Sequence, residues 1–585
     1  MRTFRFRKTF GAELLEKRQT AFTLWAPSSK NVFLHVEGMQ DLQMHSDGQG
    51  HFSITAPCGA GARYRFWVSD EQFVPDPASR SQPDGVLGAS EVIDPEYYQW
   101  QCPEWQGRPW HEAIIYELHI GLLGGYEGIC QQLDELAALG ITAIELMPIN
   151  SFGGTRNWGY DGVLPYAPAV SYGHPDELKH LIDAAHMRGL MVILDVVYNH
   201  FGPEGNFLPV YANDFFNHDQ HSTWGVGIDF SRAEVRDFFI ENVLYWIMEY
   251  RFDGVRIDAA SAISDHTWFG VLQERVQATI EPGRHVHLIL ENENNDAGLL
   301  RNGFTAQWND DGHNALHVLL TGEHEGYYKM FSKNPTQDLA RVLAEGFVYQ
   351  GQFNSYSGKC RGMPSDDLPA TKFILFLQNH DQIGNRAFGE RLLVLAKPEA
   401  VKAAYALLLL SPMIPMIFMG EEWGCITPFY FFCDFHGELA ERIKAGRRNE
   451  FSKFSAFQDE KIRKRIPDPN ARSTFEASRP DRGIRDTDLG KAWLVLTHHL
   501  LTLRKKWIIP HLHHAQSAGV KVLGLGAICA HWYLDNRKLL TISINLSDKN
   551  TKITEPHDLI YTLPDTRVAG TLPAFSIVAS MENLP

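Results

Sequence analysis

The sequence predicts an α/β protein, a (β/α)8 TIM barrel that lies between an N-terminal and a C-terminal β-sandwich. Between residues 113 and 422, eight apolar runs of strand length alternate with helical patterns. Eight such units favour a closed parallel barrel over an open sheet. Short runs bounded by turn residues occupy both ends of the chain, as in antiparallel sandwiches. The expected domains are residues 1–100, 101–508 and 509–585.

The N-terminal sandwich is expected from runs such as FTLWAP (22–27) and NVFLHVEG (31–38). The segment VPDPASRSQPDG (74–85), rich in proline, serine and glycine, indicates the path out of this sandwich. Short strands return in the stretch that begins with GVKVLGLG at residue 519. Both ends therefore predict small antiparallel domains around the barrel.

The eight barrel strands are expected from runs of apolar residues, several of which end in polar side chains. Between them, Ser231 and Glu234 have the spacing of a capping box that would begin a helix. A second helical pattern ends at Gly189. The expected strands are 113–121, 142–149, 191–200, 254–258, 287–292, 306–309, 373–381 and 414–422.

Composition narrows the class of protein. The formal net charge of −16 argues against a nucleic-acid partner, because such binding rests on lysine and arginine. The seven cysteines include no CxxC pair, which favours a reducing compartment. The N-terminus has no signal-peptide pattern, and prolines 412 and 415 interrupt the most apolar stretch, so we expect a cytoplasmic protein without a membrane span.

The segment FDGVRIDAAS (252–261) places two charged residues on a strand that otherwise looks buried. Arg256 and Asp258 are two apart, so they face the same side of the strand. In a barrel, the active site lies at the carboxyl ends of the strands, and three other strands also end in polar side chains. These are Asp195, Asn199 and His200 after the third strand, Glu291 after the fifth, and Asn379, His380 and Asp381 after the seventh.

Each of these groups also has a structural explanation when it is taken alone. Arg256 and Asp258 could form a buried ion pair, Glu291 could begin a solvated loop, and His380 could be a core histidine. Together, at one rim, three carboxyl groups favour glycoside hydrolysis, which needs a nucleophile or base and a proton donor. An arginine on the same face keeps Asp258 ionised, which predicts that Asp258 is the nucleophile.

Four motifs in order, DVVYNH (195–200), GVRID (254–258), LILEN (288–292) and QNHD (378–381), resemble those of the α-amylase superfamily of glycoside hydrolases. The resemblance implies a retaining, double-displacement mechanism. It assigns Asp258 as nucleophile, Glu291 as general acid/base and Asp381 as the third acid. Glu293 is the alternative acid if the strand continues. The supporting residues implied by the same motifs are Asp195, His200, Arg256 and His380, with Tyr160 stacking on the sugar.

Longer segments, 307–328, 378–392, 418–424 and 437–451, resemble the malto-oligosyltrehalose trehalohydrolases within that superfamily. This resemblance implies hydrolysis of the α-1,4 bond next to the terminal trehalose of a trehalose-capped malto-oligosaccharide, in sequence with a malto-oligosyltrehalose synthase. No cofactor or metal is expected. A loop after the sixth strand and the residues after Asp381 would bind substrate: Asp310, Asp311, His313, Asn314, Gln382 and Arg386.

Three alternatives stay open at this point. A glycogen branching enzyme shares the N-terminal sandwich and would transfer chains instead of hydrolysing them. An isoamylase-like debranching enzyme is a third enzymatic reading. A non-catalytic relative would lack one of the three acids, whereas Asp258, Glu291 and Asp381 are all present. Asn314 stands where a second histidine is common in the family, which bears on how the trehalose end is held.

Overall fold

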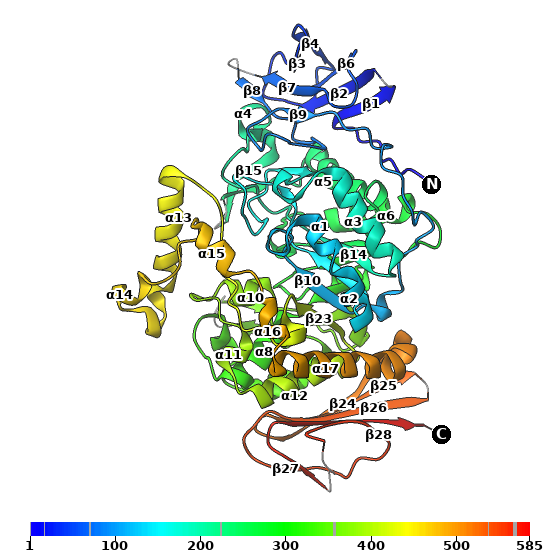
Figure 1. Ribbon diagram of the computed structural model, residues 1–585, viewed down its shortest axis with the longest axis vertical. Helices are drawn as coiled ribbons and strands as arrows, with labels where there is room; N and C mark the ends of the chain where they lie inside the picture. The colour runs from blue at the N-terminus through cyan, green and yellow to red at the C-terminus, as the bar shows by residue number, and fades with distance from the viewer. Residues whose placement is uncertain are drawn as a thin grey trace.

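Three parts follow one another along the molecule, with β-sheets at both ends and a barrel between them (Figure 1). The computed structural model describes residues 2–16, 18–68, 72–222, 225–354, 358–535, 537–565 and 570–584. No helix within these ranges is long and apolar enough to cross a membrane.

The central part is a closed barrel of eight strands, all joined in parallel, as the sequence predicts. The last strand pairs with the first, so the sheet has no open edge. The strands are β10 (Ile115–Leu118), β11 (Ala143–Leu146), β14 (Met191–Val196), β17 (Gly254–Ile257), β18 (His287–Leu290), β19 (Ala306–Trp308), β22 (Phe373–Leu375) and β23 (Ile414–Phe418).

Several strands are shorter than predicted at their carboxyl ends. The run 191–200 was expected to be one strand, but β14 ends at Val196, and the run 373–381 yields only β22, which ends at Leu375. The polar residues that follow lie beyond the hydrogen-bonded barrel.

Helices surround the barrel and bury their apolar faces on it (Figure 1). Helix α3 (Pro175–Met187) begins with a capping box between His174 and Glu177 and buries Leu178 and Leu181. Helix α12 (Pro398–Leu410) and strand β23 occupy the most apolar stretch of the chain. The strand expected at 414–422 is confirmed, although it ends at Phe418.

The capping box predicted for Ser231 and Glu234 is wrong. Helix α5 (Ala233–Met248) begins two residues after Ser231, and its N-cap, Arg232, makes no side-chain cap. The Ser231 hydroxyl instead donates to Oδ1 of Asp229 at 2.6 Å. Because Arg232 is the N-cap, Ser231 lies one residue too early to cap the helix, and its hydroxyl forms a local contact within two residues instead.

The N-terminal part consists of two antiparallel sheets. One contains β1 (Gly11–Glu16), β2 (Gln19–Trp25), β6 (His51–Ala56) and β5 (His45–Ser46), and the other contains β4 (Leu42–Gln43), β3 (Phe33–Val36), β7 (Arg63–Val68) and β8 (Gln72–Val74). Alternate residues of β2, β3 and β7 are buried, as expected for a sandwich. Buried Arg80 joins this part to the barrel through Glu249 at the end of α5, at 3.1 Å.

The C-terminal part is a five-stranded antiparallel sheet with a small two-stranded one beside it. Trp532 Nε1 donates to the carbonyl of Leu343 at 3.0 Å, at the end of helix α9 (Pro335–Glu345), and so holds the sheet against the barrel. The five strands are β24 (Gln516–Gly524), β25 (Ala527–Asp535), β26 (Lys538–Asn545), β30 (Ser576–Asn583) and β28 (Leu559–Leu563).

Candidate active site

The side chains predicted for the catalytic site meet at the carboxyl ends of three neighbouring strands. Asp195 on β14 is directly opposite Arg256 on β17 in the parallel register. Asp258 is the first residue after β17 and Glu291 the first after β18. Because these strands are adjacent in the barrel, the carboxyl groups of Asp195, Asp258 and Glu291 lie around Arg256.

Arg256 contacts three carboxylates at once. Its Nη1 lies 2.8 Å from both oxygens of Asp195 and 3.0 Å from Oδ1 of Asp258, and its Nη2 lies 2.9 Å from Oε2 of Glu291. The guanidinium is 1% exposed and lies over the ring of Trp308, 4.1 Å from its centroid. The predicted pair of Arg256 and Asp258 is therefore part of a four-residue cluster.

Asp258 is held from two sides. Besides Arg256, Asn199 donates from Nδ2 to Oδ2 of Asp258 at 2.6 Å. Burial raises the pKa of Asp258 above its ordinary value, and the positive charge of Arg256 and the Asn199 hydrogen bond oppose that rise. These two contacts favour the ionised form, which a nucleophile requires.

Glu291 is fixed by a backbone donor as well as by Arg256. The amide of Ala259 donates to Oε2 of Glu291 at 2.7 Å. Ala259 has a φ of 41°, in the left-handed region that alanine seldom adopts. Burial raises the pKa of Glu291 and Arg256 opposes it, with a net increase. Strand β18 ends before Glu293, whose side chain is exposed, so the geometry favours Glu291 as the acid.

Asp381 lies in the short helix α10 (His380–Gly384), capped by Asn379. Asn385 donates to its Oδ1 at 2.6 Å. Burial raises the pKa of Asp381, and so does the charge of Glu291, while His380 lowers it. Asp381 and Glu291 thus lie close enough for each charge to affect the other across the site.

Tyr160, which was predicted to stack on the sugar, contacts two of the predicted supporting residues, Asp195 and His380. Its hydroxyl donates to Oδ2 of Asp195 at 2.6 Å, and its ring stacks on His380 with centroids 5.1 Å apart. His200 Nε2 lies 2.9 Å from the carbonyl of Tyr160. These contacts bring the predicted supporting residues together.

The residues after the sixth strand form a helix, not the predicted loop. They begin α8 (Asp310–Thr321), whose N-cap is Asn309. Burial and the charges of Glu291 and Asp381 raise the pKa of Asp310 well above its ordinary value, so Asp310 is near these two predicted acids. Asp311 is fully buried. It accepts hydrogen bonds from the backbone amides of Val348 and Tyr349. These contacts indicate that Asp311 has a structural role.

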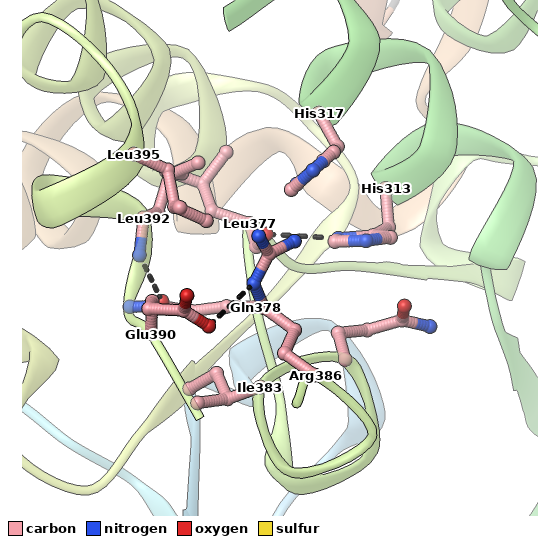
Figure 2. A pocket seen from close by; sticks show the side chains of 10 residues that line it. His313, His317, Leu377, Gln378, Ile383, Arg386, Glu390, Leu392 and Leu395 are labelled. Atoms are coloured by element: carbon pink, nitrogen blue, oxygen red, sulfur yellow. Dashed lines mark hydrogen bonds and ion pairs between the residues drawn. The ribbon is translucent and has the colours of Figure 1, made fainter. Parts of the chain in front are cut away.

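Three of the remaining predicted binding residues, His313, Gln382 and Arg386, line a cavity of about 10 Å³ (Figure 2). His313 Nδ1 lies 2.8 Å from the carbonyl of Leu377, and Arg386 pairs with Glu323 through both terminal nitrogens at 2.8 Å. Asn314 is buried on α8, and no hydrogen bond of its side chain is found among the described residues.

Two buried glutamates under the site are absent from the sequence predictions. Glu117 on β10 accepts from His380 twice, from Nδ1 at 2.5 Å and from the backbone amide at 3.0 Å. Glu145 on β11 has no hydrogen-bond partner for either carboxyl oxygen within the described part of the chain. The signal for both was a charged residue inside an apolar strand, the same signal that identified Arg256.

The described residues contain no group of three histidine, cysteine or acidic side chains arranged to hold a metal ion.

Comparison with known proteins places this geometry in a family. Residues 72–224 match the α-amylase catalytic domain. The malto-oligosyltrehalose trehalohydrolase of Deinococcus radiodurans is 40% identical over 503 residues, 85% of this chain and 82% of that protein. That of Saccharolobus solfataricus is 42% identical over 456 residues, 76% of this chain and 80% of that protein.

Among solved structures, a Salmonella typhimurium protein named provisionally as an α-amylase superimposes with a TM-score of 0.93. It is 41% identical, and the match covers 99% of this chain and 100% of that one. The similarity extends through both sandwich parts as well as the barrel. The chain belongs to the malto-oligosyltrehalose trehalohydrolase family of α-amylase-type glycoside hydrolases.

Proposed function

We propose that this chain cleaves the α-1,4-glucosidic bond next to the terminal trehalose of a malto-oligosyltrehalose and releases trehalose. The observation that carries the proposal is the cluster in which Arg256 joins Asp258 to Glu291 at the mouth of the barrel. The activity for which the related trehalohydrolases are named supports the choice of substrate. Glycoside hydrolysis requires two carboxyl groups on opposite sides of the scissile bond.

In the first step, Asp258 attacks the anomeric carbon while Glu291 donates its proton to the glycosidic oxygen of the leaving trehalose. The glycosyl chain is then bonded to Asp258. In the second step, Glu291 takes a proton from water, which attacks the same carbon and releases Asp258. Two displacements at one carbon retain its configuration.

The surroundings of the two carboxyls fit these roles. Burial raises the pKa of Glu291, so that it can hold a proton near neutral pH. Asp258 shares Arg256 and receives the Asn199 hydrogen bond, both of which favour its charged form. Asp381 and Tyr160 would bind the sugar ring that lies between the Asp258 and Glu291 carboxyls and changes shape there.

We also propose the remaining substrate contacts. Asp310, near Glu291 and Asp381, would bind sugar hydroxyls directly. The other predicted binding residues would act on the substrate only through neighbouring side chains, because contacts within the protein already hold several of them. These residues are Asp311, His313, Asn314, Gln382 and Arg386. The internal ion pair of Arg386 with Glu323 supports this division.

The division into domains at about residues 100 and 508 is a proposal as well. It is supported by the last N-terminal strand pairing at Ser90–Glu91 and by β24, which begins at Gln516. Seven free cysteines support a cytoplasmic location. A malto-oligosyltrehalose synthase would supply the substrate.

The test is to incubate the protein separately with maltotriosyltrehalose and with maltopentaose and to identify the sugars released. Trehalose and maltotriose from the first, with little cleavage of the second, are the expected products. Rapid cleavage of maltopentaose would indicate another α-amylase-type hydrolase. New branch points without trehalose would indicate a branching enzyme. Pullulan, which contains α-1,6 bonds, serves as the control for debranching.

A further inference from the structure

We propose that Glu117 is a positioning residue that holds His380 as a doubly protonated imidazolium with its Nε2–H directed at the bound sugar. The proposal rests on the function proposed above and assigns a task to a residue outside the four sequence motifs. It concerns how the sugar at the cleavage point is held, and Glu117 itself would not touch substrate.

The geometry fixes His380 at two points. Oε1 of Glu117 lies 2.5 Å from Nδ1 of His380, and Oε2 accepts from the backbone amide of the same residue at 3.0 Å. One carboxylate therefore sets both the position of the chain and the rotation of the ring. Glu117 is 1% exposed and lies within β10, a fully buried strand of the barrel. A partner on such an element has little freedom to move.

The other ring nitrogen of His380, Nε2, is not engaged by Glu117. Within the described part of the chain, Nε2 has no hydrogen-bond partner, although Nδ1 is bound to Glu117. The ring stacks on Tyr160, at 22° between the planes, and is edge-on to Trp158. With Nδ1 occupied and the ring confined, Nε2 is the atom left to donate to a sugar hydroxyl.

The charges around His380 favour its protonated form. Burial alone would lower the pKa of His380, but the Glu117 carboxylate and its hydrogen bond raise it above the ordinary value. Arg256 opposes the rise. The charged and titratable groups around the ring are Glu117 on β10, Asp381 on α10, Arg256 on β17, Asp195 on β14, Glu291 after β18, His119 after β10 and Tyr160, which stacks on the ring.

Glu145 supplies a matched control from the neighbouring strand. It is directly opposite Glu117 in the register of β10 and β11 and equally buried. Burial, with the charges of Glu117 and Asp195, raises the pKa of Glu145 well above its ordinary value. Glu117 and Glu145 are thus adjacent and equally buried, but only Glu117 is paired with an imidazole within the described part of the chain.

The first experiment compares Glu117→Gln, Glu117→Asp and Glu145→Gln in hydrolysis of maltotriosyltrehalose. We expect Glu117→Gln to lower kcat/KM by about 10- to 100-fold. The alkaline limb of the pH–activity profile of this variant should move to lower pH, because His380 loses its proton at a lower pH without the Glu117 carboxylate. Glu117→Asp keeps the charge and should recover part of the rate. Glu145→Gln should leave both the rate and the pH profile unchanged.

A double-mutant cycle separates positioning from a general structural effect. In a His380→Asn background, Glu117→Gln should lower kcat/KM no further, because the group through which Glu117 acts is gone. An equal additional loss in that background would overturn the proposal. A wild-type rate and pH profile for Glu117→Gln would do the same.

A measurement on the unaltered protein does not depend on the substrate or on the activity of any variant. In the full chain labelled with 13C at histidine Cε1, the His380 resonance, identified by its loss in His380→Asn, should report an imidazolium that persists above pH 7. A neutral His380 at that pH would contradict the proposal, even if trehalose release is confirmed. Conversely, failure to release trehalose would leave this result standing and would overturn only the proposed substrate.

Discussion

Nη2 of Arg256 lies 2.9 Å from Oε2 of Glu291, the carboxyl that we propose must carry the proton for the leaving group. The same guanidinium contacts Asp258, the proposed nucleophile, at 3.0 Å. One arginine thus stabilises the negative charge of both carboxyls. Burial raises the pKa of each of them, so their protonation depends on a balance between burial and Arg256.

Removal of either carboxyl should abolish most turnover and leave the fold intact. We expect Asp258→Asn and Glu291→Gln each to lower kcat by about 10²- to 10⁴-fold or more, because each removes a group that acts in the transition state. Turnover of maltotriosyltrehalose and the melting temperature would be measured together. Near-wild-type turnover in either variant would remove that residue from its role, and Glu293→Gln is the matched control with an exposed carboxyl.

The stereochemistry of the product is a second prediction. Because Asp258 and Glu291 share one guanidinium, they lie close together, as in enzymes that retain configuration. Proton NMR of a freshly started reaction should show the α-anomer of maltotriose before mutarotation mixes the anomers. Appearance of the β-anomer first would indicate an inverting reaction and would exclude Asp258 as a covalent nucleophile.

Arg256→Met should destabilise the fold in a manner that depends on pH. It leaves buried carboxyls without their counter-charge, and breaking such a cluster costs about 3–5 kcal/mol. Without Arg256 the folded-state pKa values of these carboxyls rise further above their unfolded values of about 4. The loss should therefore be small below that pH, where both states are protonated, and should grow as the pH rises.

Thermal unfolding of Arg256→Met and the wild-type protein across pH 4 to 8 would measure this trend. A difference in melting temperature that is the same at every pH would contradict the electrostatic explanation. It would indicate instead that the side chain acts mainly by packing on Trp308, which it contacts in the folded protein.

Asp253 offers a stability prediction away from the catalytic groups. Its carboxylate accepts from Trp105 Nε1 at 2.7 Å, from the amide of Val192 at 2.8 Å, and lies 2.9 Å from His186 Nε2. Burial would raise the pKa of Asp253, but His186 and these hydrogen bonds lower it below the ordinary value. Asp253→Asn should therefore cost about 3–5 kcal/mol near neutral pH.

The sign of the pH dependence follows from the lowered pKa. The stabilisation from ionised Asp253 is present above its unfolded pKa of about 4 and is lost as the pH falls through the folded value. Chemical denaturation at pH 7 and at pH 3.5 should show a wide gap between variant and wild type at the first pH and a narrower gap at the second. A gap that widens on acidification would contradict this account.

Sequence patterns identified the barrel because they are local. All eight strand positions were visible as apolar runs, and the fold class is confirmed. The capping box at Ser231 failed because the helix begins at Ala233, which makes Arg232 the N-cap. The loop expected at Asp310 is a helix whose N-cap is Asn309. In both cases the residue at which the helix begins depends on the local backbone conformation, which periodicity does not encode.

The sequence by itself determined that acids, an arginine and a histidine follow particular strands, because alternation and strand ends are properties of neighbouring residues. Only the tertiary structure decided which of them touch. Glu117 and His380 are 263 positions apart and meet because the barrel closes, with β23 against β10. Arg256 contacts three carboxylates because β14, β17 and β18 are adjacent in the sheet. Contacts of this kind depend on barrel closure and register, which no short stretch of sequence contains.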